Sequence, residues 1–530
     1  MTLKRIQEAI NLSKVGKFDE AFEIFDSLLR EEPNNQMILS AVGLMYISKK
    51  DYQSALIYME RAYQSNKTYA TTSALGLVYY ELCEYGKAAD IFIETLEFEK
   101  TPMIYNKLTT CLFNLRLYAN AIEYANKGYE LFPNDKLMIA NKVKALTQSG
   151  KMLEAEELCL ESLKTYSDSP ALWMHLGFLK ELIYSEEEVA IECYKAALKN
   201  GSSDAYYNMA VSYHKIGDYE NSEKCYLEFL KFNPNNEAGK ACLGMLYLAQ
   251  KKFKEGARLF CKRYLETKVF GENIWQPDTP LSKKINVFCD QGRGDNIQFV
   301  RYLPFLKEKG IEFKLYCYPE LKGIFENSYP NAEISDKEDA DKSLQCLRLT
   351  DIAYALDMDF DNIPFAEGYL KSETADIKSD KLKVGLCWEA GSTAIRTMIN
   401  RTINIDTLKP IFDLENIQYY CLQKEDTFGG CEKFPQIINL GKDFKNFEDT
   451  AKAIMAMDLV ITVDTSVAHL AGALGKKTFM LLPYATDWRW FEDTKTTPWY
   501  SSMELFKQVD RIGWEKEIGD IICKLKEYSL

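Results

Sequence analysis

The sequence predicts two kinds of fold in one chain, an α-solenoid of repeated helical hairpins followed by an α/β region with parallel strands. Three observations predict it. Small residues recur at a nearly constant interval in the first half, short β-branched runs alternate with helical segments in the second half, and two of these runs end in polar loops that open helices. At 530 residues the chain is too long for a single hydrophobic core.

The repeat period is set by small residues that recur every 32 to 35 positions. They are Ala21, Ala55, Ala88, Ala121, Ala155, Ala190, Ser222 and Gly256. Glycines twelve positions earlier, at Gly43, Gly76 and Gly244, fit a close crossing of two helices. This pattern is typical of tetratricopeptide repeats, which are paired antiparallel helices. We therefore predict an array of about eight repeats over residues 1–268.

The simplest interpretation of such an array is a scaffold that holds a partner. The groove of a repeat array is lined mainly by the first helix of each pair, and it usually accepts an extended peptide. Asn106, Asn141 and Asn208 lie on first helices and carry amides that can bind a peptide backbone. We predict these three residues as groove contacts.

Composition argues against several classes of protein. A net charge of −13 argues against nucleic acid as a main partner and slows approach to an anionic membrane. No apolar run approaches 18 residues, so we expect no membrane insertion, and the N-terminus lacks the apolar core of a signal peptide. The 14 cysteines form no C-x-x-C pair and only 3 histidines are present. We expect buried thiols in a reducing cytoplasm and no histidine-based zinc site.

The most informative segment follows the apolar run Leu459–Val463, which predicts a buried parallel strand. Asp464, Thr465 and Ser466 then stop the strand and can cap a helix that Gly475 closes. A helix N-terminus at the carboxyl end of a parallel strand is suited to bind an anion. The alternative is an ordinary strand–loop–helix unit, because capping and anion binding use the same residue types.

A second junction of this kind follows the predicted strand Ile285–Cys289. Its loop contains Gln291, Gly292, Gly294 and Asp295. The glycines allow a tight turn or a close approach to a ligand, and the Asp precedes a helix expected to begin near Asn296. Both junctions lie where doubly wound sheets keep their ligands.

Three segments, 291–299, 388–403 and 464–475, resemble bacterial glycosyltransferases related to the ADP-heptose:lipopolysaccharide heptosyltransferases, glycosyltransferase family 9. The chain is most similar to members with tetratricopeptide repeats fused in front. The resemblance covers roughly residues 283–530. It implies a GT-B fold of two facing Rossmann-like domains, a nucleotide-sugar donor, inversion at the anomeric carbon, and no obligatory metal or bound cofactor.

The resemblance also implies a domain plan. A linker at 269–284 precedes an N-terminal Rossmann-like domain at 285–380 on the acceptor side, and a C-terminal one at 381–530 on the donor side. We expect the final helix, Trp514–Tyr528, to cross back to the first of these domains.

Two charged residues carry the implied chemistry. Asp295 matches the family's catalytic Asp, which would take the proton of the acceptor; the alternative is a helix cap, and it could do both. Arg401, in an Asn-Arg-Thr-Ile sequence that matches the family, would bind the leaving diphosphate; the alternative is a surface ion pair. In the segment before it, Glu389, Ala390 and Thr393 depart from the family pattern, and Ser392 is a further candidate for a donor contact.

Further donor contacts are implied by position. Thr465 and Ser466 would contact the diphosphate, and Asp464 would bind the sugar or ribose or else hold the loop. His469 would contact donor or acceptor, or be a packed helical residue. The remaining candidates are Gln423 and Lys424 for the base and ribose, and Tyr484, Trp488 and Arg489 for the sugar or acceptor, with a core Trp as the alternative for Trp488.

The resemblance thus implies transfer of a sugar to Ser or Thr hydroxyls of a protein acceptor captured by the repeats, flagellin being one candidate. Two alternatives stay open. One is a repeat scaffold or adaptor with an inactive transferase domain, and the other is transfer to lipopolysaccharide or another glycan. The sequence does not reveal the nucleotide of the donor.

Overall fold

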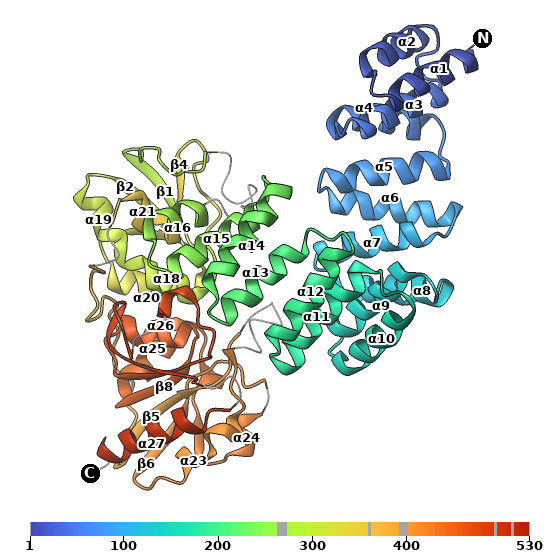
Figure 1. Ribbon diagram of the computed structural model, residues 1–530. Helices are drawn as coiled ribbons and strands as arrows, with labels where there is room; N and C mark the ends of the chain where they lie inside the picture. Colours follow the sequence, from blue (N-terminus) through green and yellow to red (C-terminus); the bar gives the residue numbers. More distant parts are fainter. Residues whose placement is uncertain are drawn as a thin grey trace. The chain divides into compact units, whose positions relative to one another are not determined.

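The computed structural model describes residues 2–261, 273–358, 362–391, 401–427, 429–491, 495–509 and 513–528. Contacts divide the chain into two compact units, Met1–Ala205 and Tyr206–Leu530 (Figure 1). The division falls inside the predicted repeat array 1–268, so the helices after Ala205 belong to the second unit.

The first unit is a series of helices that pack in consecutive antiparallel pairs. Their bounds are α1 Thr2–Lys14, α2 Phe18–Glu31, α3 Gln36–Ser48, α4 Tyr52–Ser65, α5 Tyr69–Glu81, α6 Tyr85–Phe98, α7 Pro102–Asn114, α8 Tyr118–Leu131, α9 Lys136–Gln148, α10 Met152–Thr165, α11 Pro170–Tyr184 and α12 Glu187–Lys199. The helical repeat solenoid predicted for the N-terminal half is confirmed.

Small residues hold the helix pairs together. Ala21 and Ala55 are fully buried, as are their equivalents in the later repeats of this unit. At Gly43 an added Cβ would lie 2.6 Å from Met59 Sδ, and at Gly76 it would lie 2.6 Å from the Phe92 ring. A side chain at either glycine would push the two helices of a pair apart, which is why the period is visible in the sequence.

The second unit begins with two more helix pairs, the second of which packs against the α/β region. These helices are α13 Ala205–Lys215, α14 Tyr219–Phe232, α15 Glu237–Ala249 and α16 Phe253–Phe260. Leu248 and Phe260 share one hydrophobic core with Phe299 of the α/β region. Trp275 N–H donates to Cys346 O at 2.8 Å and so joins the following segment to the same sheet. The last repeats and the first sheet therefore form one packed body.

The first sheet has four parallel strands in the order β3-β2-β1-β4. Its elements are β1 Lys284–Phe288, α18 Arg293–Phe299, η1 Val300–Tyr302, α19 Leu303–Glu308, β2 Glu312–Tyr316, α20 Pro319–Ser328, β3 Glu333–Ser335, β4 Gln345–Arg348, η2 Leu349–Asp351 and α21 Ile352–Ala355. The helix expected to begin near Asn296 begins three residues earlier, at Arg293, and it includes Gly294.

The second sheet has seven strands in the order β10-β11-β9-β8-β5-β6-β7, all parallel except the β10–β11 pair. Its elements are β5 Leu382–Cys387, η3 Ile405–Leu408, α23 Lys409–Phe412, β6 Ile417–Cys421, α24 Gly430–Lys433, β7 Ile437–Asn439, η4 Gly441–Asp443, α25 Phe447–Ala456, β8 Leu459–Val463, α26 Ser466–Ala473, β9 Thr478–Leu482, η5 Trp488–Trp490, β10 Thr496–Thr497, β11 Tyr500–Lys507 and α27 Glu515–Tyr528.

The final helix does not follow the expectation that it crosses back to the first sheet. Ile518, Ile521 and Leu525 of α27 are buried in the core of the second sheet, together with Phe479 and Phe506. The apolar stripe of α27 is therefore satisfied within its own domain.

Candidate functional site

Described residues of the second unit line a cavity of about 1260 Å³ at the carboxyl ends of both sheets. The wall includes the β1–α18 loop, the ends of β5, β6 and β8, the start of α26, and the segment after β9. Two residues of the last helix pair, Met245 and Phe260, also line it. Loops at the carboxyl ends of parallel strands are where α/β folds bind their ligands.

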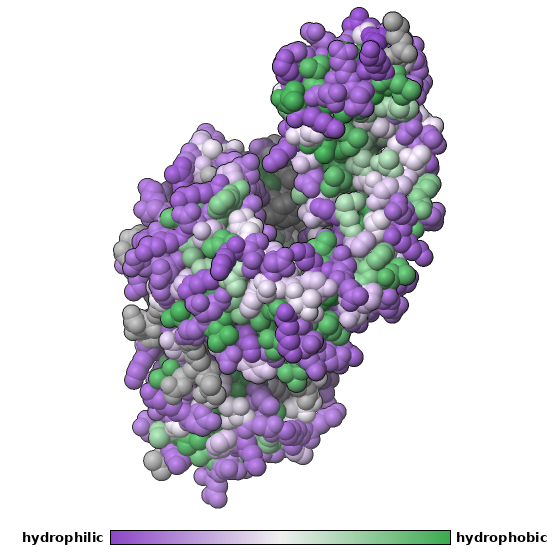
Figure 2. Space-filling view, turned by 45° about the vertical axis from the view of Figure 1, so that its right-hand side comes forward, coloured by the Kyte–Doolittle hydropathy of each residue, from purple (hydrophilic) through white to green (hydrophobic). Residues whose placement is uncertain are grey.

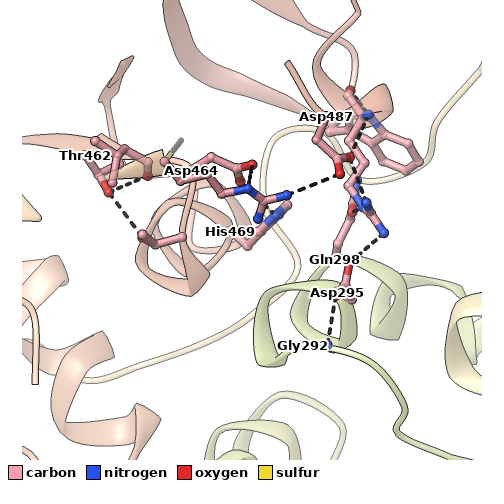
Figure 3. A network of polar contacts seen from close by, with 12 residues as sticks. Gly292, Asp295, Gln298, Thr462, Asp464, His469 and Asp487 are labelled. Carbon is pink, nitrogen blue, oxygen red and sulfur yellow. Dashed lines mark hydrogen bonds and ion pairs between the residues drawn. The ribbon is translucent and has the colours of Figure 1, made fainter. Parts of the chain in front are cut away.

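Asp295 lies in the first turn of α18, on the cavity wall (Figure 3). Its Oδ2 accepts the backbone N–H of Gly292 at 2.9 Å, so the carboxylate caps the helix. Its Oδ1 forms an ion pair with Arg489 Nη2 at 2.5 Å. The capping alternative is therefore present, although the helix begins earlier than expected, and the same carboxylate also faces the second sheet.

A chain of charges runs from Asp295 across the cavity. Arg489 Nη1 pairs with Asp487 Oδ1 at 2.7 Å, and Arg401 Nη2 pairs with Asp487 Oδ2 at 3.3 Å. Arg401 Nε in turn pairs with Asp464 Oδ2 at 3.3 Å. Figure 3 shows Asp464 on the left, Asp487 at the upper right, and Asp295 on its helix below Asp487. Three carboxylates thus alternate with two guanidinium groups.

Burial makes these ionisations strongly interdependent. Burial raises the pKa of Asp464 above its ordinary value, although Arg401 opposes the shift. Arg489 and Arg401 outweigh burial at Asp487 and lower its pKa to about 2. Asp295 and Asp487 raise the pKa of Arg489. Asp487 is therefore the fixed anion of the chain, while Asp464 is the carboxylate that is harder to keep charged.

Gly294 and His469 form the close contact between α18 and α26. An added Cβ at Gly294 would lie 2.7 Å from His469 Cδ2. His469 is buried, its Nδ1 lies 3.0 Å from the Tyr500 hydroxyl, and its ring stacks on Trp490 at 5.2 Å. Burial lowers the pKa of His469 to about 3, so the ring is neutral at pH 7. The packed-histidine alternative describes this residue, although it also lines the cavity.

The N-terminus of α26 opens on the cavity through Thr465, Ser466 and Val467. Thr465 is the N-cap residue but its side chain makes no capping hydrogen bond, and its Oγ1 lies 3.3 Å from Thr462 Oγ1 instead. The partial positive charge of this helix end therefore faces the cavity, as an anion site requires.

Gln423 and Lys424 also lie on the cavity wall, after β6. Gln423 Oε1 accepts the backbone N–H groups of Trp388 at 3.0 Å and Glu389 at 3.2 Å, which ties the loop after β5 to the loop after β6. Its Nε2 is buried and makes no hydrogen bond within the described residues. Gln291, which adopts a φ of 62°, and Gly292 line the opposite wall. Ser392 lies outside the described residues.

Two aromatic candidates do not line the cavity. Trp488 is buried, with its ring 6.3 Å from Phe260 and 6.3 Å from Trp499, so the core alternative describes it. Tyr484 donates its backbone N–H to Gln508 Oε1 at 3.2 Å and also lies away from the cavity wall. Their neighbour Arg489 does line the cavity, because successive residues of this 3-10 turn point in different directions.

The sequence analysis missed three side chains that organise the site. Asp487 bridges both arginines, Gln298 Oε1 accepts from Arg489 Nε at 3.0 Å, and Asn296 Nδ2 donates to the backbone oxygen of Asp290 at 2.7 Å. Asp487 carried a usable signal, since an Asp just before an aromatic turn can cap it. The other two have no local signal.

The predicted groove residues lie on first helices. Asn106 lies on α7, Asn141 on α9 and Asn208 on α13 of the second unit. Asn141 is buried, and its Nδ2 makes no hydrogen bond within the described residues. One turn further, Lys144 Nζ lies 4.2 Å from the centre of the Phe113 ring, and burial lowers the pKa of Lys144.

Two other kinds of feature are absent from the part of the chain that the structure describes. No group of three or more His, Cys, Asp or Glu side chains is arranged to hold a metal ion there. None of the described helices is long and apolar enough to span a membrane.

Known proteins resemble this chain mainly through its repeats. The tetratricopeptide-repeat family matches residues 6–70 and 203–236. The chain is 23% identical over 454 residues to Protein FlbA of Caulobacter vibrioides, and the match covers 75% of this chain and 74% of that protein. A match of this extent is longer than the predicted array 1–268, so the similarity to FlbA includes part of the region beyond it.

Other relatives cover less. The TPR repeat-containing protein MJ1428 of Methanocaldococcus jannaschii is 24% identical over 222 residues, covering 38% of this chain and 39% of that protein. BBSome complex member BBS4 of Bos taurus is 23% identical over 255 residues, covering 46% of each. The chain therefore spans less than half the length of these two relatives. A solved tetratricopeptide repeat protein from Parabacteroides merdae is 16% identical, with a TM-score of 0.42, covering 46% of this chain and 97% of that one.

Proposed function

We propose that the second unit is a metal-independent, inverting glycosyltransferase of the GT-B type that uses a nucleotide-sugar donor. The observation that carries the proposal is the placement of three groups on one cavity. A carboxylate, Asp295, comes from the first sheet, whereas a guanidinium, Arg401, and the α26 N-terminus come from the second. This is the set of groups that transfer to a hydroxyl with departure of a diphosphate requires.

In the proposed reaction, the acceptor oxygen forms a bond to the anomeric carbon while its proton passes to Asp295. The bond from that carbon to the diphosphate oxygen breaks, and the diphosphate leaves with the electron pair. Its charge would be stabilised by Arg401 and by the N–H groups at Thr465 and Ser466. Gln423 and Lys424 would lie against the base and ribose.

Donor binding would change the charge pairing. The side chain of Arg401 is 32% exposed, and its guanidinium forms ion pairs with two carboxylates, those of Asp464 and Asp487, at 3.3 Å each. A diphosphate would compete for this guanidinium. Burial raises the pKa of Asp464, so this carboxylate can take up a proton when it loses its ion pair. Arg401 would therefore leave Asp464 more easily than Asp487. Asp487 would remain to orient Arg401 and Arg489.

We propose a protein acceptor, modified on Ser or Thr hydroxyls, because the repeats occupy the N-terminal half and such repeats bind other proteins. Flagellin stays one candidate for it. Transfer to lipopolysaccharide or another glycan would use the same chemistry but would leave the repeats without a role.

Nucleotide binding tests the proposal. Thermal shifts would be recorded with ADP, UDP, GDP, CDP and CMP, each with and without EDTA. A ligand at 100 times its dissociation constant adds about 2.7 kcal/mol of stability, so one nucleotide should raise the melting temperature in the presence of EDTA. Asp295→Asn should keep this shift and lose sugar transfer. No shift with any nucleotide would contradict the proposal.

A scaffold or adaptor with an inactive second unit is the competing function. The specific observation in its favour is the first unit's Lys144, which lies over an aromatic ring with no carboxylate within 4.0 Å among the described residues and is accompanied by Asn141. A partner's carboxylate would fit this cation. Binding of a protein by residues 1–205 and no nucleotide binding by the full chain would favour this function.

A further inference from the structure

The cavity is larger than one small ligand needs. Pockets for small molecules have volumes of about 300–1,000 Å³, whereas this one measures about 1260 Å³. It therefore has room for a second substrate beside the proposed donor. The chemistry of its walls indicates which end that substrate occupies.

The order of the strands gives the cavity a direction. Neighbouring strands run β9, β8, β5 and β6 across the second sheet. Asp487 and Arg489 follow β9, Asp464 follows β8, and Gln423 follows β6. The proposed diphosphate site at α26 lies after β8, so a nucleoside would extend toward β5 and β6. The acceptor would then approach from the β9 side, where Arg489 holds Asp295.

Beside the charged Asp487 and Arg489, part of the wall on the β9 side is apolar and comes from the last helix pair. Helix α15 contacts η5, the 3-10 turn that contains Arg489, and the ring of Phe260 on α16 lies 6.3 Å from Trp488 in the same turn. Met245 of α15 is half-buried and lines the cavity together with Phe260. Figure 1 shows α15 and α16 beside the first sheet. An apolar surface therefore lies at the end of the cavity nearest the candidate base.

Resting on the proposed function, we propose that Met245 and Phe260 form a subsite for an apolar side chain of a polypeptide acceptor, next to the hydroxyl that receives the sugar. Helix α15 is the first helix of its pair, as α13 is of the pair before it. A polypeptide lying along these first helices would reach the cavity at Met245. A glycan acceptor has little apolar surface to place there, so the surface favours a polypeptide.

Synthetic peptides test this subsite. Two fluorescent peptides, each with one Ser in a Gly-Ala sequence, would carry either Leu or Asp on both sides of the Ser. We expect the full chain to bind the Leu peptide at least tenfold more tightly in fluorescence anisotropy. Met245→Asp should abolish that preference, and Met245→Leu, the matched control, should keep it. Equal binding of the two peptides, a preference that survives Met245→Asp, or no binding of either peptide would overturn the proposal.

Two further measurements separate this inference from the proposed function. Nucleoside diphosphate thermal shifts should be the same for Met245→Asp and for the unchanged chain, which shows that the cavity is intact. If the Leu peptide binds preferentially but receives no sugar from any donor, the subsite stands and the transferase proposal falls. If both peptides are modified equally well, the transferase proposal stands and the subsite falls.

Discussion

Charged side chains differ in exposure and in pairing between the first unit and the cavity. In the repeats, many charges lie on the surface in pairs along one helix, such as Glu123 and Lys127, whose side chains are 55% and 51% exposed. In the cavity, Asp295 and Arg489 are 20% and 8% exposed and pair across different elements. Figure 2 shows hydrophilic side chains over much of the visible surface, with apolar ones among them.

This difference indicates what each region is built for. Exposed ion pairs contribute little to stability, so the first unit is held together by its buried small residues rather than by charge. Buried ion pairs seldom stabilise a protein more than apolar residues of the same size would, because each charge loses its hydration. A row of five buried or half-buried charges is therefore better explained by ligand chemistry than by folding.

Removing Asp487 should have the largest effect on stability. Asp487→Ala leaves Arg401 and Arg489 partly buried without their shared partner, and breaking such a pair typically costs about 3–5 kcal/mol. Tryptophan fluorescence during urea unfolding would measure it, because six of the seven tryptophans lie after Ala205. The variant should unfold at a markedly lower urea concentration.

The same kind of change in the first unit is the control. Glu123→Ala removes one member of an exposed pair on α8, and we expect no measurable change in the free energy of unfolding. Circular dichroism would follow it, because the first unit is almost entirely helical. If the two variants lost the same free energy of unfolding, the cavity ion pairs would contribute no more to stability than the surface pairs do. The contrast between the two regions would then be wrong.

Nucleotide binding should depend on Arg401 to a smaller degree. Arg401→Ala should weaken nucleoside diphosphate binding by roughly 1.5–3 kcal/mol, the range for hydrogen bonds to charged groups. Arg401→Lys, the matched control, should recover only part of this, because an ammonium cannot make a bidentate contact. Isothermal calorimetry would measure both. If the alanine variant bound nucleoside diphosphate with unchanged affinity, Arg401 would serve only in the ion pairs with Asp464 and Asp487.

Features with a local pattern could be predicted from the sequence. The repeat period was visible because each helix pair needs a small residue at one crossing, and β8 was predicted with the bounds it has, Leu459–Val463. The start of α18 was predicted too late, because two glycines indicate a loop. Gly294 is instead a helical residue whose missing side chain lets His469 approach.

Pairings between distant segments could not be predicted in this way. Nothing near Arg489 indicates that it pairs with Asp295, and nothing near Trp488 distinguishes a cavity wall from a core. The sequence did place Asp464 and Asp295 after predicted strands, and the family resemblance singled out Arg401; all three line one cavity. The packing of the two sheets determines which carboxylate each arginine pairs with, and this packing depends on the whole unit.

A methyl group at Gly294 should cost less than the loss of Asp487. Gly294→Ala places a Cβ 2.7 Å from His469 Cδ2 and forces α18 away from α26, which should cost about 1–3 kcal/mol. Gly86→Ala is the matched control in the first unit. Gly86 lies in α6 with no atom within 4 Å of the added Cβ, so this change should stabilise by about 0.4–1 kcal/mol. Urea unfolding would measure whether each substitution raises or lowers the free energy of unfolding. A Gly294→Ala variant that is more stable than the unchanged chain would contradict the close contact.

The last prediction concerns pH and compares two histidines, one in each unit. Burial lowers the pKa of His469 to about 3 and that of His175 to about 4. Between pH 6.5 and these values the unfolded chain takes up a proton that the folded chain does not, so stability falls as the pH falls, whereas above pH 6.5 neither histidine contributes. His469→Gln should therefore flatten the acid loss of stability of the second unit from pH 6.5 to 4.

Comparing variants isolates His469 from its neighbours. Asp464, Arg489 and Tyr500 face the ring, and the raised pKa of Asp464 shifts stability with pH in the opposite direction. Because Asp464 is present in both chains, the difference between the unchanged chain and His469→Gln reports the histidine. His175→Gln should leave the tryptophan-monitored curve of the second unit unchanged and alter only the helical signal of the first. If His469→Gln keeps the full acid loss, the ring is protonated in the folded state and the neutral, packed histidine is wrong.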